Sequence, residues 1–202
     1  MKKVDINCIL DMSGSMSNII DKAREGFNKF LKEQKQSGND INFTLAFFDT
    51  EFFVPYRNVN IQEVKKLTEE TYYARGGTAL YDSLGSLIDL YLDDLATIPK
   101  NDRADKTLFV IITDGEENSS KYYHRDLIKR MVTEMREDFN TEFIYLGANQ
   151  DACFQAEIMG MNTSNAFNYD ATNDGITVAY ANMSKATSYY VNNEVKENLF
   201  QQ

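Results

Sequence analysis

The sequence predicts an α/β domain whose doubly wound, mostly parallel sheet of about six strands carries helices on both faces. Short apolar runs that fit strands alternate along the chain with longer segments that are apolar at helical spacing. The most apolar run, Thr107 to Thr113, lacks polar alternation, which favours a central strand buried on both faces. Two runs stop at acids, Asp11 and Asp114, and ligands of such sheets bind beyond the carboxyl ends of central strands.

The individual elements follow this alternation. Pro55 places one strand at an edge of the sheet, as the antiparallel hairpin partner of its predecessor, because proline cannot donate to a ladder. Apolar runs predict strands at Val4–Leu10, Ile41–Phe48, Glu51–Val59, Thr107–Thr113, Glu142–Leu146 and Ala166–Tyr169. Apolar residues at helical spacing predict helices at Ile19–Leu31, Leu80–Leu95, Arg125–Asp138, Asp151–Met159 and Asp174–Tyr190, with a short helix over Ile61–Leu67.

Length and composition fit one soluble domain over residues 1–202. The chain has 31 acidic and 21 basic residues, a balance that disfavours nucleic acid and anionic membranes as partners. No apolar run approaches the roughly 20 residues that span a bilayer. Its two cysteines, Cys8 and Cys153, are too few for a disulfide framework, and Asp5 and Asn7 interrupt any signal-peptide core. We therefore expect a cytoplasmic protein.

The first predicted strand leads directly into a group of oxygen-bearing side chains. Asp11, Ser13 and Ser15 occupy alternate positions around Gly14, and a turn can point them into one small volume. Hydroxyl and carboxylate oxygens are the ligands that a hard cation such as Mg²⁺ prefers. The same residue types also form helix N-caps, which is the alternative interpretation of this segment alone.

Two further loops bring oxygen donors beside glycine to the same predicted edge of the sheet. They are Gly76–Thr78, which precedes a helix, and Thr113–Gly115, which follows the central strand. With the first loop they resemble the von Willebrand factor type A domain, whose signature is D-x-S-x-S, then a threonine, then an aspartate. The signature residues stand in family order as Asp11, Ser13, Ser15, Thr78 and Asp114. The order of strands and helices agrees with that family from Lys3 to about Leu146.

This resemblance implies a metal-ion-dependent adhesion site. Ser13, Ser15 and Thr78 would contact Mg²⁺ or Mn²⁺ directly, whereas Asp11 and Asp114 would act wholly or partly through water. Neutral ligands leave the ion much of its charge, and one coordination position can accept an aspartate or glutamate of a protein partner. The expected function is a metal-dependent protein-interaction module. The alternative is a scaffold or assembly subunit in which the metal only holds the loops together.

A narrower resemblance concerns the source of the chain. The segment Ile144–Asp151 and the final helix look like those of bacterial and phage members of the family, some of which accompany stress-response genes.

Catalysis is the disfavoured alternative. Ser13, His124 and Asp114 have the residue types of a hydrolase triad, but Ser13 lacks the G-x-S-x-G elbow. His124, the only histidine, stands in a polar segment at the start of a helix, where a solvated or capping role is expected. No glycine-rich nucleotide motif follows a strand. We therefore expect no enzyme activity.

Residues next to the signature have two possible roles. Tyr72, Tyr73 and Arg75 precede the threonine loop and either form a binding rim or pack locally. Glu116 and Glu117 follow Asp114 and are expected to lie in a solvated loop, with participation in the metal site as the alternative.

Overall fold

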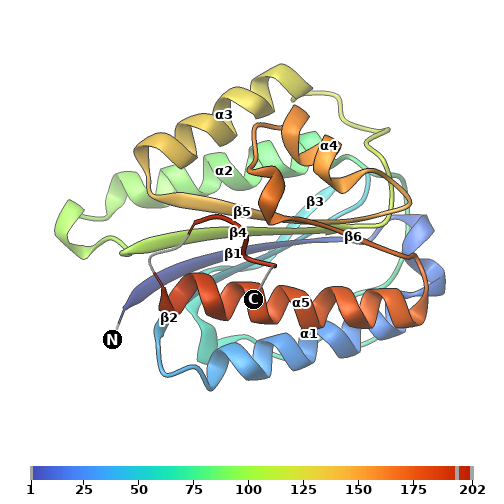
Figure 1. Cartoon of the computed structure of the whole chain (residues 1–202), viewed down its shortest axis with the longest axis horizontal. Coiled ribbons are helices and arrows are strands. Elements are labelled where there is room, and N and C mark those ends of the chain that lie inside the picture. Colours follow the sequence, from blue (N-terminus) through green and yellow to red (C-terminus); the bar gives the residue numbers. More distant parts are fainter. Residues whose placement is uncertain (1, 194–195, 201–202) are drawn as a thin grey trace.

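Two parallel strands, β1 (Lys3–Asp11) and β4 (Lys106–Thr113), form the centre of a six-stranded sheet in the computed structural model, which describes residues 2–193 and 196–200 (Figure 1). The strand order is β3-β2-β1-β4-β5-β6, and only β3 runs antiparallel to its neighbour. The predicted doubly wound sheet with one antiparallel edge is confirmed. The remaining strands are β2 (Asp40–Phe48), β3 (Phe52–Asn60), β5 (Thr141–Ala148) and β6 (Ala166–Tyr169).

Helices cover both faces of this sheet (Figure 1). Successive residues of β1 point to opposite faces, so that Leu10 joins the apolar cluster beneath α1 and α5 while Ile9 joins the cluster beneath α2, α3 and α4. Every residue of β4 is buried, as its lack of alternation predicts. The helices are α1 (Ile20–Lys35), α2 (Leu80–Thr97), α3 (Arg125–Asp138), α4 (Ala152–Ile158) and α5 (Asn173–Asn192).

The register of the central strands decides where the conspicuous acids lie. Leu10 of β1 pairs with Ile112 of β4, so the next residues of both strands meet at one edge of the sheet. This edge therefore brings Asp11 beside Thr113 and Asp114.

Both outer strands have features that weaken further strand pairing. Strand β3 contains Pro55 at its centre, and its register with β2 shifts between Phe43 and Leu45 and again between Leu45 and Phe47. Strand β6 at the opposite edge has only 4 residues.

The short helix predicted over Ile61–Leu67 is wrong. Only one 3-10 turn forms, η2 (Ile61–Glu63), and the chain then continues in an extended conformation from Val64. The backbone of this segment is hydrogen-bonded by side chains of α1 instead: Lys35 donates to the carbonyl of Val64 at 2.6 Å, and Leu67 donates to Asn28 at 2.7 Å. Ile61, Val64 and Leu67 are nevertheless all buried, so their apolar spacing reflects burial against α1.

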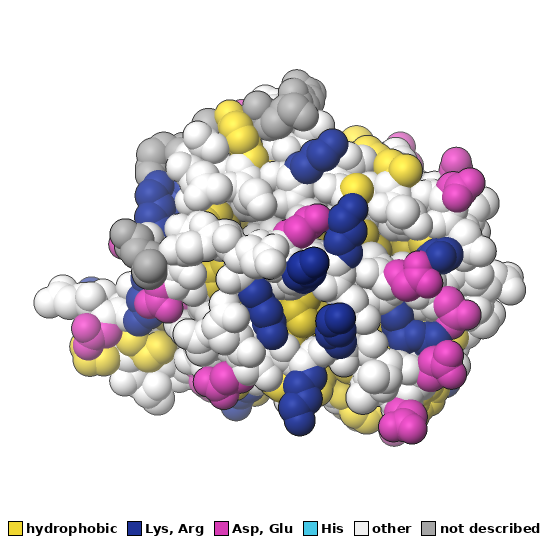
Figure 2. Space-filling model, turned by 90° about the horizontal axis from the view of Figure 1, so that it is seen from below, with side chains coloured by type: hydrophobic (Ala, Val, Ile, Leu, Met, Phe, Trp, Pro, Cys, Tyr) yellow, Lys and Arg dark blue, Asp and Glu magenta, His cyan; other side chains and the backbone are white. Residues whose placement is uncertain are grey.

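The net charge of −10 is unevenly distributed over the surface. On the face formed by α1 and α5, lysine and arginine side chains gather near the middle (Figure 2). Helix α1 alone carries five basic residues, Lys22, Arg24, Lys29, Lys32 and Lys35.

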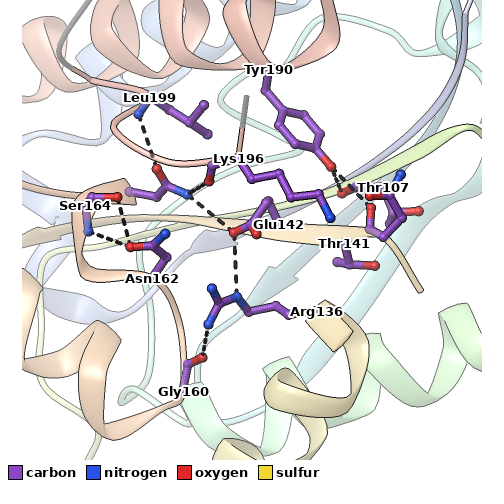
Figure 3. A network of polar contacts seen from close by, with 12 residues as sticks. Thr107, Arg136, Thr141, Glu142, Gly160, Asn162, Ser164, Tyr190, Lys196 and Leu199 are labelled. Carbon is purple, nitrogen blue, oxygen red and sulfur yellow. Dashed lines mark hydrogen bonds and ion pairs between the residues drawn. The ribbon is translucent and has the colours of Figure 1, made fainter. Parts of the chain in front are cut away.

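A buried polar network joins the C-terminal segment to the end of the sheet opposite Asp11 (Figure 3). Glu142 of β5 accepts a hydrogen bond from Asn165 at 3.4 Å and lies 3.6 Å from Arg136. Asn165 also donates to the carbonyl of Lys196 at 2.7 Å and accepts from the backbone of Leu199 at 3.2 Å. This network fastens residues 196–200 where β5 begins.

Candidate metal centre

Asp11 lies at the carboxyl end of β1 with a carboxylate that is fully removed from solvent. One oxygen accepts the backbone N–H of Ser13 at 2.6 Å, and the other accepts the hydroxyl of Thr113 at 2.5 Å. Burial raises the pKa of Asp11 to about 6, although both hydrogen bonds favour its charged form. The side chain is therefore fixed in position and costly to ionise without a nearby cation.

The two serines connect this carboxylate to a second one. The chain turns into a short 3-10 helix, η1 (Gly14–Asn18), which places the hydroxyls of Ser13 and Ser15 2.9 Å apart. Ser15 donates in turn to Asp114 at 2.5 Å. Burial also raises the pKa of Asp114. Four of the five predicted site residues thus form one hydrogen-bonded group.

Thr78 reaches the same group from the loop that precedes α2. Its N–H donates to the side chain of Asn118 at 3.0 Å, and its carbonyl accepts the N–H of Asn118 at 3.0 Å. A Cβ at Gly115 would lie 3.2 Å from the Thr78 hydroxyl oxygen and 3.4 Å from that of Ser15. Both hydroxyls therefore face the backbone of Gly115, and the structure brings all five predicted residues together.

Backbone hydrogen bonds hold these loops against one another. Gly14 donates to Gly76 at 3.0 Å, and Arg75 donates to the carbonyl of Met12 at 2.6 Å. Gly76 has a φ of +67°, a conformation that favours glycine, so the crossing of the two loops depends on this residue type. The arrangement of the donors is thus built by the chain itself.

The donor set fits a hard divalent cation. All five side chains offer oxygen, the preference of Mg²⁺ and Mn²⁺. Among the ion pairs of the described residues, none involves Asp11 or Asp114, so no basic side chain offsets these buried carboxylates. Residues 2–193 and 196–200 contain no group of three or more His, Cys, Asp or Glu side chains that could hold a metal. The candidate site has only two such side chains, because hydroxyls supply the other three of its five donors.

The rim interpretation of Tyr72 is wrong. Its side chain is completely buried, its ring lies 5.2 Å from that of Phe47, and its hydroxyl donates to the carbonyl of Asp11 at 2.5 Å. Tyr72 therefore supports the loop Asp11–Ser15 from the interior of the protein. Tyr73 is 45 % exposed and Arg75 remains at the surface, so the rim role stays open to these two residues.

Glu117 also has a different place from the solvated loop expected for it. Its carboxylate accepts the N–H of Tyr81 at 2.9 Å and those of Ser119 and Ser120 at 2.9 and 2.8 Å. It thereby fixes the loop after β4 to the first turn of α2. The same loop carries Asn118, which holds Thr78. Glu116 is exposed as expected.

Three supporting residues lie outside the predicted set. Thr113 orients Asp11, and Asn118 orients Thr78. The carboxylate of Asp49 accepts a hydrogen bond from Arg75 at 2.5 Å, and its backbone carbonyl accepts the N–H of Ala79 at 2.8 Å. The only advance signal is their position, since Thr113 and Asp49 stand where predicted strands end.

No hydrolase triad forms. His124 is exposed at the start of α3, and among the hydrogen bonds of the described residues it makes none with Ser13 or Asp114.

The mostly parallel sheet carries helices on both faces, and its hydroxyl and carboxylate donors lie at the carboxyl ends of the central strands. These two features define a class of ligand-binding α/β domains. Within this class the chain belongs to the von Willebrand factor type A domain family, whose model matches residues 5–182. No curated protein matches the sequence.

Solved structures share this fold at low identity. Proximal thread matrix protein 1 from the mussel byssus, with zinc in its MIDAS motif, is 13 % identical with a TM-score of 0.64, over 91 % of this chain and 48 % of the mussel chain. The pilus adhesin SpaC of Lactobacillus rhamnosus GG is 15 % identical with a TM-score of 0.67, over 95 % and 30 %. The manganese-loaded TRAP protein of Plasmodium vivax is 18 % identical with a TM-score of 0.62, over 88 % and 71 %. The chain thus spans less than half the length of the mussel protein and of SpaC.

Proposed function

We propose that this chain is a non-enzymatic protein-interaction module that binds Mg²⁺ or Mn²⁺ through Asp11, Ser13, Ser15, Thr78 and Asp114. The three hydroxyls would contact the ion directly, and the two carboxylates would act on it wholly or partly through water and orient the hydroxyls. A bound divalent ion would offer an electrophilic coordination position to a carboxylate. The partner is a protein that contributes an aspartate or glutamate side chain.

One observation carries this proposal: the two buried carboxylates of Asp11 and Asp114 are linked through Ser13 and Ser15, and neither takes part in any ion pair of the described residues. Asp114 accepts from Ser15 at 2.5 Å, and Ser15 lies 2.9 Å from Ser13. Such a group is costly without a cation and is stabilised by one. A pocket of three direct carboxylates would more than neutralise the ion, whereas hydroxyl ligands leave it the positive charge that attracts a partner's acid.

The names of related structures support the same reading. The mussel protein holds zinc in its MIDAS motif, and the TRAP protein of Plasmodium vivax was crystallised loaded with manganese. SpaC is described as an adhesin. By extension we propose divalent-metal binding and protein adhesion for this chain.

The alternative is a scaffold subunit in which the metal only holds the loops together. The hydrogen bonds from Gly14 to Gly76 and from Arg75 to Met12 favour the interaction module, because they join the loops without an ion. We expect the far-UV circular dichroism spectrum to remain unchanged when a chelator removes the metal. Loss of the spectrum on chelation would assign the metal a structural role.

The decisive experiment is a pull-down from the source organism in the presence of Mg²⁺. A partner is expected to be retained by the wild type and lost with chelator or with Thr78→Ala. The matched control is Thr177→Ala, which removes an exposed threonine of α5 and should retain the partner. Equal retention under all conditions would place the interface elsewhere on the molecule and refute the metal-dependent function.

We further propose a cytoplasmic location, an origin in a bacterium or phage with a role in stress response, and a single domain over residues 1–202. Both cysteines are free, Cys8 buried and Cys153 exposed, which supports a reducing compartment. None of the helices in the described part of the chain has the length and apolar character needed to cross a membrane.

A further inference from the structure

An open groove of about 620 Å³ borders the loop Asp11–Ser15 on the side of β3. Its floor is formed by the buried side chains of Met12 and Phe47. One wall is strand β3, through Phe53 and Pro55, and the other is the segment before the threonine loop, through Tyr73. We call it the Phe53 groove.

The walls of the Phe53 groove expose large apolar surface. Phe53 is 36 % exposed and Tyr73 is 45 % exposed, and only three other large apolar side chains of the described residues are as exposed. The guanidinium of Arg75 lies 4.5 Å from the ring centre of Phe53 and 5.8 Å from that of Tyr73. Because Asp49 holds Arg75 at 2.5 Å, the two rings are arranged before any partner arrives.

The Phe53 groove is continuous with the candidate metal centre. Met12, on its floor, stands between Asp11 and Ser13 in the chain, and its carbonyl accepts the N–H of Arg75 at 2.6 Å. A segment that presents a side chain to the donors therefore passes close to the groove.

We propose that the Phe53 groove binds an apolar side chain, such as leucine, of the same partner segment that presents an aspartate or glutamate to the metal. This inference rests on the proposed function and specifies the partner further. Glu70 lines the groove and takes part in none of the ion pairs of the described residues, so a neutral or basic residue of the partner fits beside it. Pro55 disfavours pairing of the segment with β3 as an added strand, so recognition uses side chains.

The proposal can be tested with short capped peptides that carry one glutamate among alanines, and with a series in which leucine replaces each alanine in turn. Binding is measured by calorimetry to the full chain with Mg²⁺ and with chelator. At least one leucine position should tighten Mg²⁺-dependent binding about tenfold, the value expected for partial burial of a leucine side chain. The gain should disappear in the double variant Phe53→Thr, Tyr73→Ser and persist in Tyr122→Ser, which removes a tyrosine that is 82 % exposed elsewhere.

The possible results separate this inference from the proposed function. If Mg²⁺ binds to the protein and no leucine position tightens peptide binding, the groove inference is overturned while the metal site stands. A gain that persists with chelator, or in the double variant, also overturns it. If the protein takes up no Mg²⁺, the proposed function fails and the inference fails with it. Calorimetry with Mg²⁺ alone on each variant shows whether the metal site remains intact.

Discussion

Replacing Asp11 with asparagine should make the metal-free protein more stable and abolish metal binding. The amide fits the site, because its oxygen can accept the N–H of Ser13 and its NH₂ can donate to Thr113. The Thr113 hydroxyl can then donate to the carbonyl of Gly115, which lies 3.1 Å away. Asp11→Asn therefore keeps the hydrogen bonds and removes the buried charge.

The size and sign of the effect follow from the pKa of Asp11. Burial raises this pKa from 3.8 to about 6, so the folded chain binds the proton more tightly than the unfolded chain. The corresponding stability is fully present below a pH of about 4 and is lost as the pH rises through about 6. The difference of about two pKa units corresponds to about 3 kcal/mol. The free energy of unfolding of Asp11→Asn should exceed that of the wild type by up to this amount at neutral pH, and the two should converge near pH 4.

The assay is urea unfolding of both proteins at several pH values with chelator, repeated with saturating Mg²⁺. Magnesium should stabilise the wild type and leave Asp11→Asn unchanged, since only a bound ligand shifts the equilibrium. The matched control is Asp93→Asn, which alters an exposed aspartate of α2 and should leave the free energy of unfolding within about 0.5 kcal/mol of the wild type. If Asp11→Asn and the wild type unfold alike at neutral pH with chelator, the reasoning about the buried carboxylate is refuted.

Two other substitutions test the support of the site. Tyr72→Phe removes the 2.5 Å hydrogen bond to the carbonyl of Asp11 and should lower the free energy of unfolding by about 1–3 kcal/mol in urea; an unchanged value would contradict the supporting role of this buried tyrosine. Gly115→Ala places a methyl group 3.2 Å from the Thr78 hydroxyl oxygen and should weaken Mg²⁺ binding about ten- to hundredfold in calorimetry, with the far-UV spectrum unchanged. Full Mg²⁺ affinity in this variant would show that Thr78 does not face the ion.

Periodic patterns predicted the fold well because burial produces them directly. The uninterrupted apolar run of β4 and the helical spacing of α3 gave the central strand and the bounds Arg125–Asp138 correctly. The spacing of Ile61, Val64 and Leu67 gave a wrong prediction of a helix, because the same pattern of burial arises in an extended segment whose backbone groups bond to side chains of α1. Apolar spacing thus reports which residues face the core, and local hydrogen bonding decides the conformation.

The supporting residues of the site escaped prediction for a different reason. Their partners are distant in sequence: Tyr72 bonds to a residue 61 positions away, and Glu117 to one 36 positions away. They also lie in loops, where no periodicity reveals which side is buried. Only the folded arrangement shows that Tyr72 is interior while its neighbour Tyr73 is exposed.

The two outer strands of the sheet bear on how the molecule behaves in a crowded solution. Exposed strand edges are templates on which other chains polymerise, and proteins that must stay dispersed blunt them. Pro55 and the shifted register do this at β3, and the 4-residue length of β6 does so at the other edge. The chain can therefore reach a high concentration without stacking into fibrils through the edges of its sheet.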